Sequence, residues 1–313
     1  QELGSMLPVM ALAGCTHGAI EKRSGHAGDE ETFGMMYGGR VLDLCASPGS
    51  KAMQALEIVG GNGRTKKKGR VVANDVNQSR LQALLDAVGR SGLPDDLVKR
   101  LVTTNHDASL FPYPKSGKLF DAVVADVPCS GDGTIRKDSA ILPNWSPRTG
   151  NALHGLQLRI LMRALELVRV GGTVAYSTCS LNPIEDEAVV SAAIRSANGT
   201  VELVDWPTTV LPGLVRRKGI TNWSVADYVD DDTRGTSGAD SEQDAVQHLH
   251  FYETYEDAVR AEMADAEQSM WPNHLMDQQD YHLERCTRLW PQDQDTGGFF
   301  VALLQKMKPF KRV

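Results

Sequence analysis

Short apolar runs alternate with amphipathic segments along most of this chain. Residues 120–127 have the continuous hydrophobicity of a strand buried on both faces, and helical spacing of apolar residues marks His154 to Val168 just before the next such run. Strands separated by helices indicate an α/β fold whose sheet is mainly parallel and covered on both faces. We expect seven strands, the last of them antiparallel, at residues 41–45, 70–75, 100–104, 120–127, 172–179, 201–204 and 297–304.

Two segments interrupt this alternation. Residues 14–34 are rich in glycine, histidine and charged residues, which predicts a surface loop. Residues 227–267 hold 13 acidic residues and only two basic ones, so we expect the part from 227 to 245 to be poorly ordered. The pattern from Tyr252 to Met270 predicts an exposed helix.

Composition narrows the class of protein. The 313 residues carry a net charge of −7, but 25 basic against 22 acidic residues give residues 1–220 a net +3, while 8 against 18 give residues 221–313 a net −10. This balance lacks the basic signature of a typical nucleic-acid-binding protein. Five cysteines, an odd number, do not suggest a disulfide framework, so we expect an intracellular protein of the nucleus or cytoplasm. Without a C-x-x-C pair or a long apolar run, we expect neither a metal nor a membrane span.

Polar groups at the ends of the first three strands suggest a bound nucleoside. The turn at residues 46–51 contains Pro48-Gly49 and enters a helix, so its backbone amides can face a polar ligand, although it matches neither G-x-G-x-x-G nor a P-loop. Asp75 closes the second strand, where an acidic side chain can bind a ribose hydroxyl or, alternatively, cap a helix. Asp107, after the third strand, has the same two interpretations. Together the three strand ends favour a nucleoside-containing cofactor.

Two cysteines follow the fourth and fifth strands. Cys129 lies in Asp-Val-Pro-Cys-Ser-Gly and Cys179 in Tyr-Ser-Thr-Cys-Ser-Leu-Asn-Pro, both polar surroundings. A buried cysteine often has only a packing role, but ligands of open α/β sheets bind outside the carboxyl ends of the strands. We therefore expect one pocket with two thiols, one of which can be a nucleophile if its pKa is lowered. Cys45, placed inside a strand, and Cys15 and Cys286, placed outside the sheet, are expected to be structural.

The assembled motifs resemble those of the Nop/Sun family of RNA cytosine-5 methyltransferases, most closely its eukaryotic tRNA-modifying branch. The resemblance is carried by residues 42–51, 73–75, 105–108, 126–138 and 177–190. It implies a class I, Rossmann-like fold that binds S-adenosylmethionine, and an RNA substrate, which for the tRNA-modifying branch would be tRNA. Ser47 and Ala52 depart mildly from the family pattern, which usually has Ala and Thr there.

The resemblance also implies a role for each matching residue. The methionine end of the cofactor would be wrapped by Cys45, Ala46, Ser47, Pro48, Gly49, Ser50 and Lys51. Asp75 would bind the ribose, Asp107 the adenine, and Asp126 would lie where the cofactor meets the target cytosine. Cys179 would be the nucleophile that adds to carbon 6, and Cys129 would assist product release. Glu185, Asp186 and Glu187 need only the favourable helix dipole to explain them.

The expected organisation is a single catalytic domain over residues 1–313, with its core at about 35–205 and 286–308, a variable acidic insertion at about 207–285, and the RNA-binding region of the family absent. Two alternatives stay open. A catalytically silent RNA-binding or scaffold protein could retain the fold, and a methyltransferase for small molecules or proteins would not need paired cysteines. DNA cytosine methyltransferases place their nucleophile in the Pro-Cys motif, but their Glu-Asn-Val motif is absent, so RNA is favoured.

Overall fold

The computed structural model describes residues 3–15, 36, 38–60, 69–230, 247–272 and 279–310. Its strands are β1 (Arg40–Asp43), β2 (Arg70–Asn74), β3 (Leu101–Thr104), β4 (Phe120–Asp126), β5 (Val168–Thr178), β6 (Val201–Leu203), β7 (Arg217–Lys218), β8 (Val225–Asp230), β9 (Gln247–Tyr252), β10 (Thr287–Leu289) and β11 (Phe299–Lys306). Its α-helices are α1 (Leu3–Gly14), α2 (Ser50–Gly60), α3 (Gln78–Arg90), α4 (Asp95–Val98), α5 (Pro147–Leu167), α6 (Glu187–Ala197), α7 (Tyr255–Arg260) and α8 (Pro291–Gln294). Short 3₁₀ helices include η2 (Ala108–Leu110), η3 (Asp132–Thr134), η4 (Ser139–Asn144), η5 (Gln268–Met270) and η7 (Leu283–Arg285).

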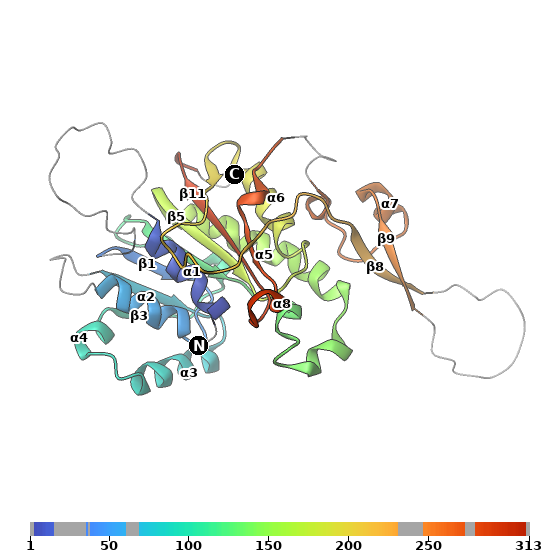
Figure 1. Ribbon diagram of the computed structural model, residues 1–313. Helices are drawn as coiled ribbons and strands as arrows, with labels where there is room; N and C mark the ends of the chain where they lie inside the picture. Colours follow the sequence, from blue (N-terminus) through green and yellow to red (C-terminus); the bar gives the residue numbers. More distant parts are fainter. Residues whose placement is uncertain are drawn as a thin grey trace, which may run out of the picture.

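One sheet organises the described part of the chain (Figure 1). Its strands follow the order β3-β2-β1-β4-β5-β11-β10-β7, with β6 also paired to β11. Strands β1 to β5 pair in parallel, whereas β11 runs antiparallel to both β5 and β6. The predicted mainly parallel sheet with an antiparallel last strand is confirmed.

Apolar side chains leave both faces of the central strands. In β4, Val123 and Ala125 join a core with helices α5 and α6, whereas Ala122 and Val124 join a second core with α1, α2 and α3. Both sets are fully buried. Burial on two faces explains why the parallel strands have continuous rather than alternating hydrophobicity.

Within the described residues the sheet has nine strands, so the expectation of seven was too low. The two additional strands, β7 and β10, have two and three residues and pair with each other at the edge beyond β11. Strands this short cannot show a periodic pattern. They form because β10 pairs with β11 on one side and, on the other, with β7, which lies far from it in the sequence.

The acidic segment also differs from its prediction. Residues 225–230 form β8 and pair with β9 in a hairpin that extends away from the sheet (Figure 1). The helix predicted from Tyr252 to Met270 is wrong over most of its length, because only Tyr255–Arg260 is α-helical and Gln268–Met270 forms the short 3₁₀ helix η5. Tyr252, Met270 and Trp271 instead pack with Val225 in a small core beneath the hairpin. The rest of the predicted disordered segment, 231–245, and residues 16–34 lie outside the described residues.

Among the helices that the structure describes, none has the length and apolar character needed to span a bilayer.

Candidate active site

The predicted residues Asp126 and Cys179 meet Asp43 at the carboxyl edge of the parallel strands. Asp43 ends β1, Asp126 ends β4, and Cys179 directly follows β5. Because β4 pairs with both β1 and β5, these three strand ends are neighbours. In β5, Ser177 is the register partner of Asp126 and donates a hydrogen bond of 2.6 Å to its Oδ1.

A tight turn brings Lys51 to this edge. Strand β1 ends at Asp43, so Cys45 lies in the turn and not inside a strand as predicted. Gly49 has φ of +108°, and a Cβ there would lie 2.9 Å from Leu84, so glycine is required. From the first turn of α2, the Lys51 ammonium forms a 2.7 Å ion pair with Asp126. The ammonium also lies 5.6 Å from the centre of the Phe299 ring.

Asp43 is a functional candidate that sequence reasoning missed. Its side chain is fully buried, and neither carboxylate oxygen has a hydrogen-bond partner among the described residues. Burial raises the pKa of Asp43 to about 7, although Lys51 opposes the rise. The buried Ser47 hydroxyl in the following turn also lacks a partner. Unpaired buried polar groups are costly, and an acidic residue within an apolar strand was the signal that could have identified this one.

Asp75 lies beside the same turn. Its carboxylate accepts hydrogen bonds from the backbone N–H of Ser47 at 3.2 Å and of Asn77 at 2.9 Å. The N-cap of α3 is Asn77, so the capping interpretation of Asp75 is not needed. The next residue, Val76, is an apolar side chain with 68% of its surface exposed. A buried acid and an exposed apolar residue thus stand together at the end of β2.

Asp107 has a local structural role. It is exposed, and its carboxylate caps η2 by accepting a 2.8 Å hydrogen bond from the Ser109 N–H. Its segment nevertheless lies next to β2, because Asn105 donates hydrogen bonds to the backbone oxygens of Asp75 and Val76 at 2.7 and 2.9 Å. The capping interpretation therefore accounts for this carboxylate, and its role toward the cofactor stays a prediction.

The two thiols are in direct contact. The Sγ atoms of Cys129 and Cys179 lie 3.2 Å apart, and both side chains are half-buried. The two sulfurs are therefore brought together at neighbouring strand ends, as the sequence predicted. The loops are tied together further by two hydrogen bonds, from the Gly133 N–H to the Cys179 carbonyl at 3.0 Å and from the Leu181 N–H to Asp132 at 2.9 Å.

The two thiols differ in the direction of their pKa shifts. The hydrogen bond from Cys129 lowers the pKa of Cys179, with a further contribution from Lys51 against an opposing one from Asp126. The same hydrogen bond, burial and the charge of Glu185 raise the pKa of Cys129 well above its usual range. The arrangement therefore favours a thiolate at Cys179 and a protonated thiol at Cys129. A thiolate is the reactive form.

The carboxylates that follow Cys179 are not explained by the helix dipole. Glu185, Asp186 and Glu187 are all fully buried, and α6 begins only at Glu187. Arg288 lies between two of them: its Nε donates to Glu187 at 2.7 Å, and its Nη2 is 3.2 Å from Asp186. Its Nη1 donates to the Leu181 carbonyl at 2.9 Å, which connects this buried group to the Cys179 loop. The dipole interpretation was wrong because it assumed a solvent-facing helix start.

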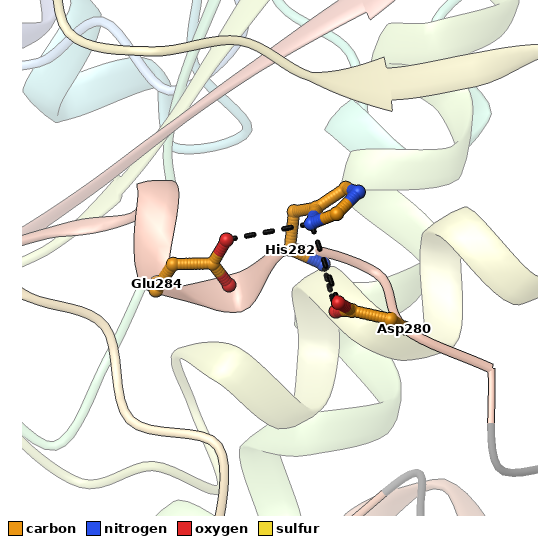
Figure 2. Close-up of side chains that lie close together, drawn as sticks. All are labelled: Asp280, His282 and Glu284. Carbon is orange, nitrogen blue, oxygen red and sulfur yellow. Dashed lines mark hydrogen bonds and ion pairs between the residues drawn. The ribbon is translucent and has the colours of Figure 1, made fainter.

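A second polar cluster contains Asp280, His282 and Glu284 (Figure 2). The His282 Nδ1 is 3.4 Å from each carboxylate, and the cluster borders a cavity of about 520 Å³ that Arg195 and Glu202 also line. All three side chains are at least 41% exposed. Water can satisfy such exposed groups, so the cluster receives no functional assignment.

Known proteins similar to this chain are RNA-modifying enzymes. The family model described as 16S rRNA methyltransferase RsmB/F matches residues 35–220. The chain is 40% identical over 296 residues to the multisite-specific tRNA:(cytosine-C(5))-methyltransferase trm4b of Schizosaccharomyces pombe, covering 86% of this chain and 39% of that protein. It is 38% identical over 279 residues to the tRNA (cytosine(34)-C(5))-methyltransferase of Drosophila melanogaster, covering 86% and 34%. The chain thus spans little more than a third of these relatives.

Solved structures support the fold. NSun6 from Pyrococcus horikoshii with SFG superposes with a TM-score of 0.58 at 18% identity, covering 98% of this chain and 53% of that one. A methyltransferase homologue from the same organism gives a TM-score of 0.56 at 21% identity, covering 98% and 67%. These similarities confirm the expected class I, Rossmann-like methyltransferase fold, and the sequence matches confirm the predicted Nop/Sun relationship. The chain belongs to the RsmB/F family of RNA methyltransferases.

Proposed function

We propose that this chain transfers a methyl group from S-adenosylmethionine to carbon 5 of cytosine in RNA, with tRNA as the substrate. The observation that carries the proposal is the pair of thiols 3.2 Å apart, one on each of two neighbouring strand ends, beside Asp126. Two relatives named as tRNA cytosine-5 methyltransferases support the choice of tRNA. Five cysteines without a disulfide support an intracellular, nuclear or cytoplasmic, location.

The cofactor fits the edge formed by β1 and β2. Asp43 and Ser47 offer buried oxygens without partners, and Asp75 stands beside the exposed apolar Val76, which suits a ribose next to an adenine. The residues that would hold it are Asp43, Cys45, Ala46, Ser47, Pro48, Gly49, Ser50, Lys51, Asp75, Asp107 and Asp126. S-adenosylmethionine supplies an electrophilic methyl group when bound there.

Cys179 begins the reaction in this proposal. Its thiolate adds to carbon 6 of cytosine, forming a C–S bond and moving an electron pair toward carbon 5, which becomes nucleophilic. Asp126 lies between Lys51 and the Cys179 loop, where it can hydrogen-bond the base and favour this addition. The target base must leave its stack to reach this position.

Cys129 completes the reaction. After carbon 5 gains the methyl group, its proton must pass to a base and the C–S bond must break, returning the electron pair to the Cys179 sulfur. The Cys129 sulfur, 3.2 Å away, can hydrogen-bond the departing thiolate. Without it, the covalent enzyme–RNA adduct would persist. Cys129 therefore assists product release.

The test compares Cys129→Ala with Cys179→Ala in an assay for SDS-stable protein–RNA adducts, using tRNA transcript and S-adenosylmethionine. We expect a stable adduct with Cys129→Ala and none with Cys179→Ala. Cys15→Ala, which changes a free cysteine at the end of α1, is the matched control and should turn over normally. The reverse pattern would exchange the two roles. Cofactor binding with neither adduct nor methylated RNA would instead favour the silent scaffold.

A further inference from the structure

Glu185 holds together the two loops that carry the thiols. Its side chain is fully buried, and its carboxylate accepts four hydrogen bonds. The donors are the Ser130 N–H at 2.8 Å, the Ser130 hydroxyl, the Ser180 hydroxyl at 2.8 Å and the Gln157 amide at 3.0 Å. Ser130 directly follows Cys129 and Ser180 directly follows Cys179, so one carboxylate binds both loops one residue beyond each thiol.

The loops need this connection because the sheet ends before the thiols. Strand pairing between β4 and β5 extends only to Asp126 and Ser177. Beyond that point, hydrogen bonds set the distance between the loops. Besides the two serines, Gln157 links Glu185 to the Cys129 loop. Its amide donates both to Glu185 and, at 2.9 Å, to the carbonyl of Pro128, the residue immediately before Cys129.

A packing role alone does not explain an acidic side chain here. Removing a carboxylate from water is costly unless it is fully hydrogen-bonded, and an apolar side chain of similar size would fill the space without that cost. The donors that satisfy Glu185 come from the residues after the two thiols and from a glutamine attached to the residue before one of them. The neighbouring Glu187 offers a contrast, because its carboxylate binds Arg288 and not these serines.

We propose that Glu185 is a positioning residue that sets the distance between the Cys129 and Cys179 sulfurs. The inference rests on the proposed function, since it gives that distance a purpose: the leaving thiolate of Cys179 must stay within hydrogen-bond reach of Cys129. Charge supports the same arrangement. Glu185 faces Cys129 and raises its pKa, whereas Lys51 and Asp126 face Cys179 with opposing effects on its pKa.

The distance between the thiols can be tested without the methyl-transfer reaction. Oxidised glutathione converts Cys129 and Cys179 to a disulfide and releases two reduced glutathione molecules, so the equilibrium measures how effectively the two thiols meet. Intact mass separates this disulfide from mixed disulfides with glutathione. We expect Glu185→Gln, which keeps the shape but not the charge, to lower the effective concentration of the pair by about tenfold or more.

Glu187→Gln is the matched control, because it neutralises an equally buried carboxylate of the same segment. We expect it to lower stability without changing the glutathione equilibrium. An equal fall in the effective concentration of the thiol pair in both variants would overturn the positioning role and leave only a structural one. If Glu185→Gln does not fold, a second variant replaces it. The double substitution Ser130→Ala with Ser180→Ala removes the two hydroxyl donors and should lower the effective concentration of the thiol pair to the same extent. An unchanged equilibrium in the double variant would also overturn the proposal.

Turnover gives the second readout. In Glu185→Gln we expect kcat for tRNA methylation to fall about tenfold or more while KM stays near the wild-type value, because the thiols act after the substrate binds. An unchanged kcat would overturn the inference. The two proposals can fail separately. If the wild-type protein shows no methylation but Glu185→Gln still lowers the effective concentration of the thiol pair, the proposed function fails and the positioning role stands.

Discussion

Removing Arg288 should destabilise the protein more than removing any exposed arginine. Its guanidinium has 2% exposure and lies against the carboxylates of Asp186 and Glu187, which are fully buried. Arg288→Met retains a long apolar side chain but leaves two buried carboxylates without their cation. Breaking a buried ion pair by removing one partner costs about 3–5 kcal/mol, because the remaining charge stays out of water. We expect a loss of this size in the free energy of unfolding.

The loss should depend on pH. Burial already raises the pKa of Asp186 well above its usual range, and Arg288 opposes that rise. Without Arg288 the pKa rises further, so the folded variant binds a proton at a pH where the unfolded chain does not. A proton bound only by the folded state stabilises it as the pH falls. The difference in the free energy of unfolding between Arg288→Met and wild type should therefore be smaller at about pH 5 than at about pH 8.

Urea unfolding, followed by circular dichroism at both pH values, measures the effect. Arg217→Met is the matched control, because it removes the arginine of an ion pair with Asp293 in which the Arg217 side chain is 61% exposed. Exposed ion pairs contribute little to stability, so this variant should unfold close to wild type. The reasoning is refuted if the two arginine variants lose equal stability, or if the loss in Arg288→Met grows as the pH falls.

Three further predictions concern the site and its support. Val76→Asp places a charge where the adenine is expected, and should weaken S-adenosylmethionine binding by about tenfold or more in calorimetry, with normal thermal stability. Gly133→Ala adds a Cβ 2.6 Å from the Cys179 carbonyl and 2.7 Å from the Gly298 carbonyl, so unfolding should show a loss of about 1–3 kcal/mol. Burial lowers the pKa of His154, so the stability that the neutral imidazole contributes should be complete at neutral pH and decline below about pH 6.5. In urea titrations His154→Gln should reduce that decline.

Local patterns were sufficient for the central sheet. Residues 120–127 have apolar side chains on both faces, and this property is visible in the sequence because it belongs to the strand itself. Strand β10 shows the limit: its three residues are ordered by β11, which follows ten residues later. The helix predicted after Tyr252 failed for a related reason, because burial beneath the β8–β9 hairpin, and not helical periodicity, sets the positions of its apolar residues.

The site was predictable where function depends on strand ends, and less so where it depends on burial. Cys129 and Cys179 were expected in one pocket because parallel strands end at one edge, and their sulfurs are in contact. For Asp43 the only signal was an acidic residue within an apolar strand, and it does not show that the carboxylate is orphaned. The buried Arg288 could not be recognised, since nothing in a local sequence states how much water a side chain retains. The acidic residues after Cys179 were misinterpreted for the same reason.

The surroundings of the thiols explain why equivalent sulfurs can act differently. A hydrogen bond between two thiols is symmetric in principle, because either sulfur can be the donor. The hydrogen bond between them lowers the pKa of Cys179 and raises that of Cys129; Glu185 adds to the rise at Cys129, whereas Asp126 and Lys51 have opposing effects on the pKa of Cys179. The proposed mechanism needs the same division, with a thiolate that attacks and a thiol that assists its departure. The proposed roles therefore depend on the surroundings of the pair and not on either cysteine alone.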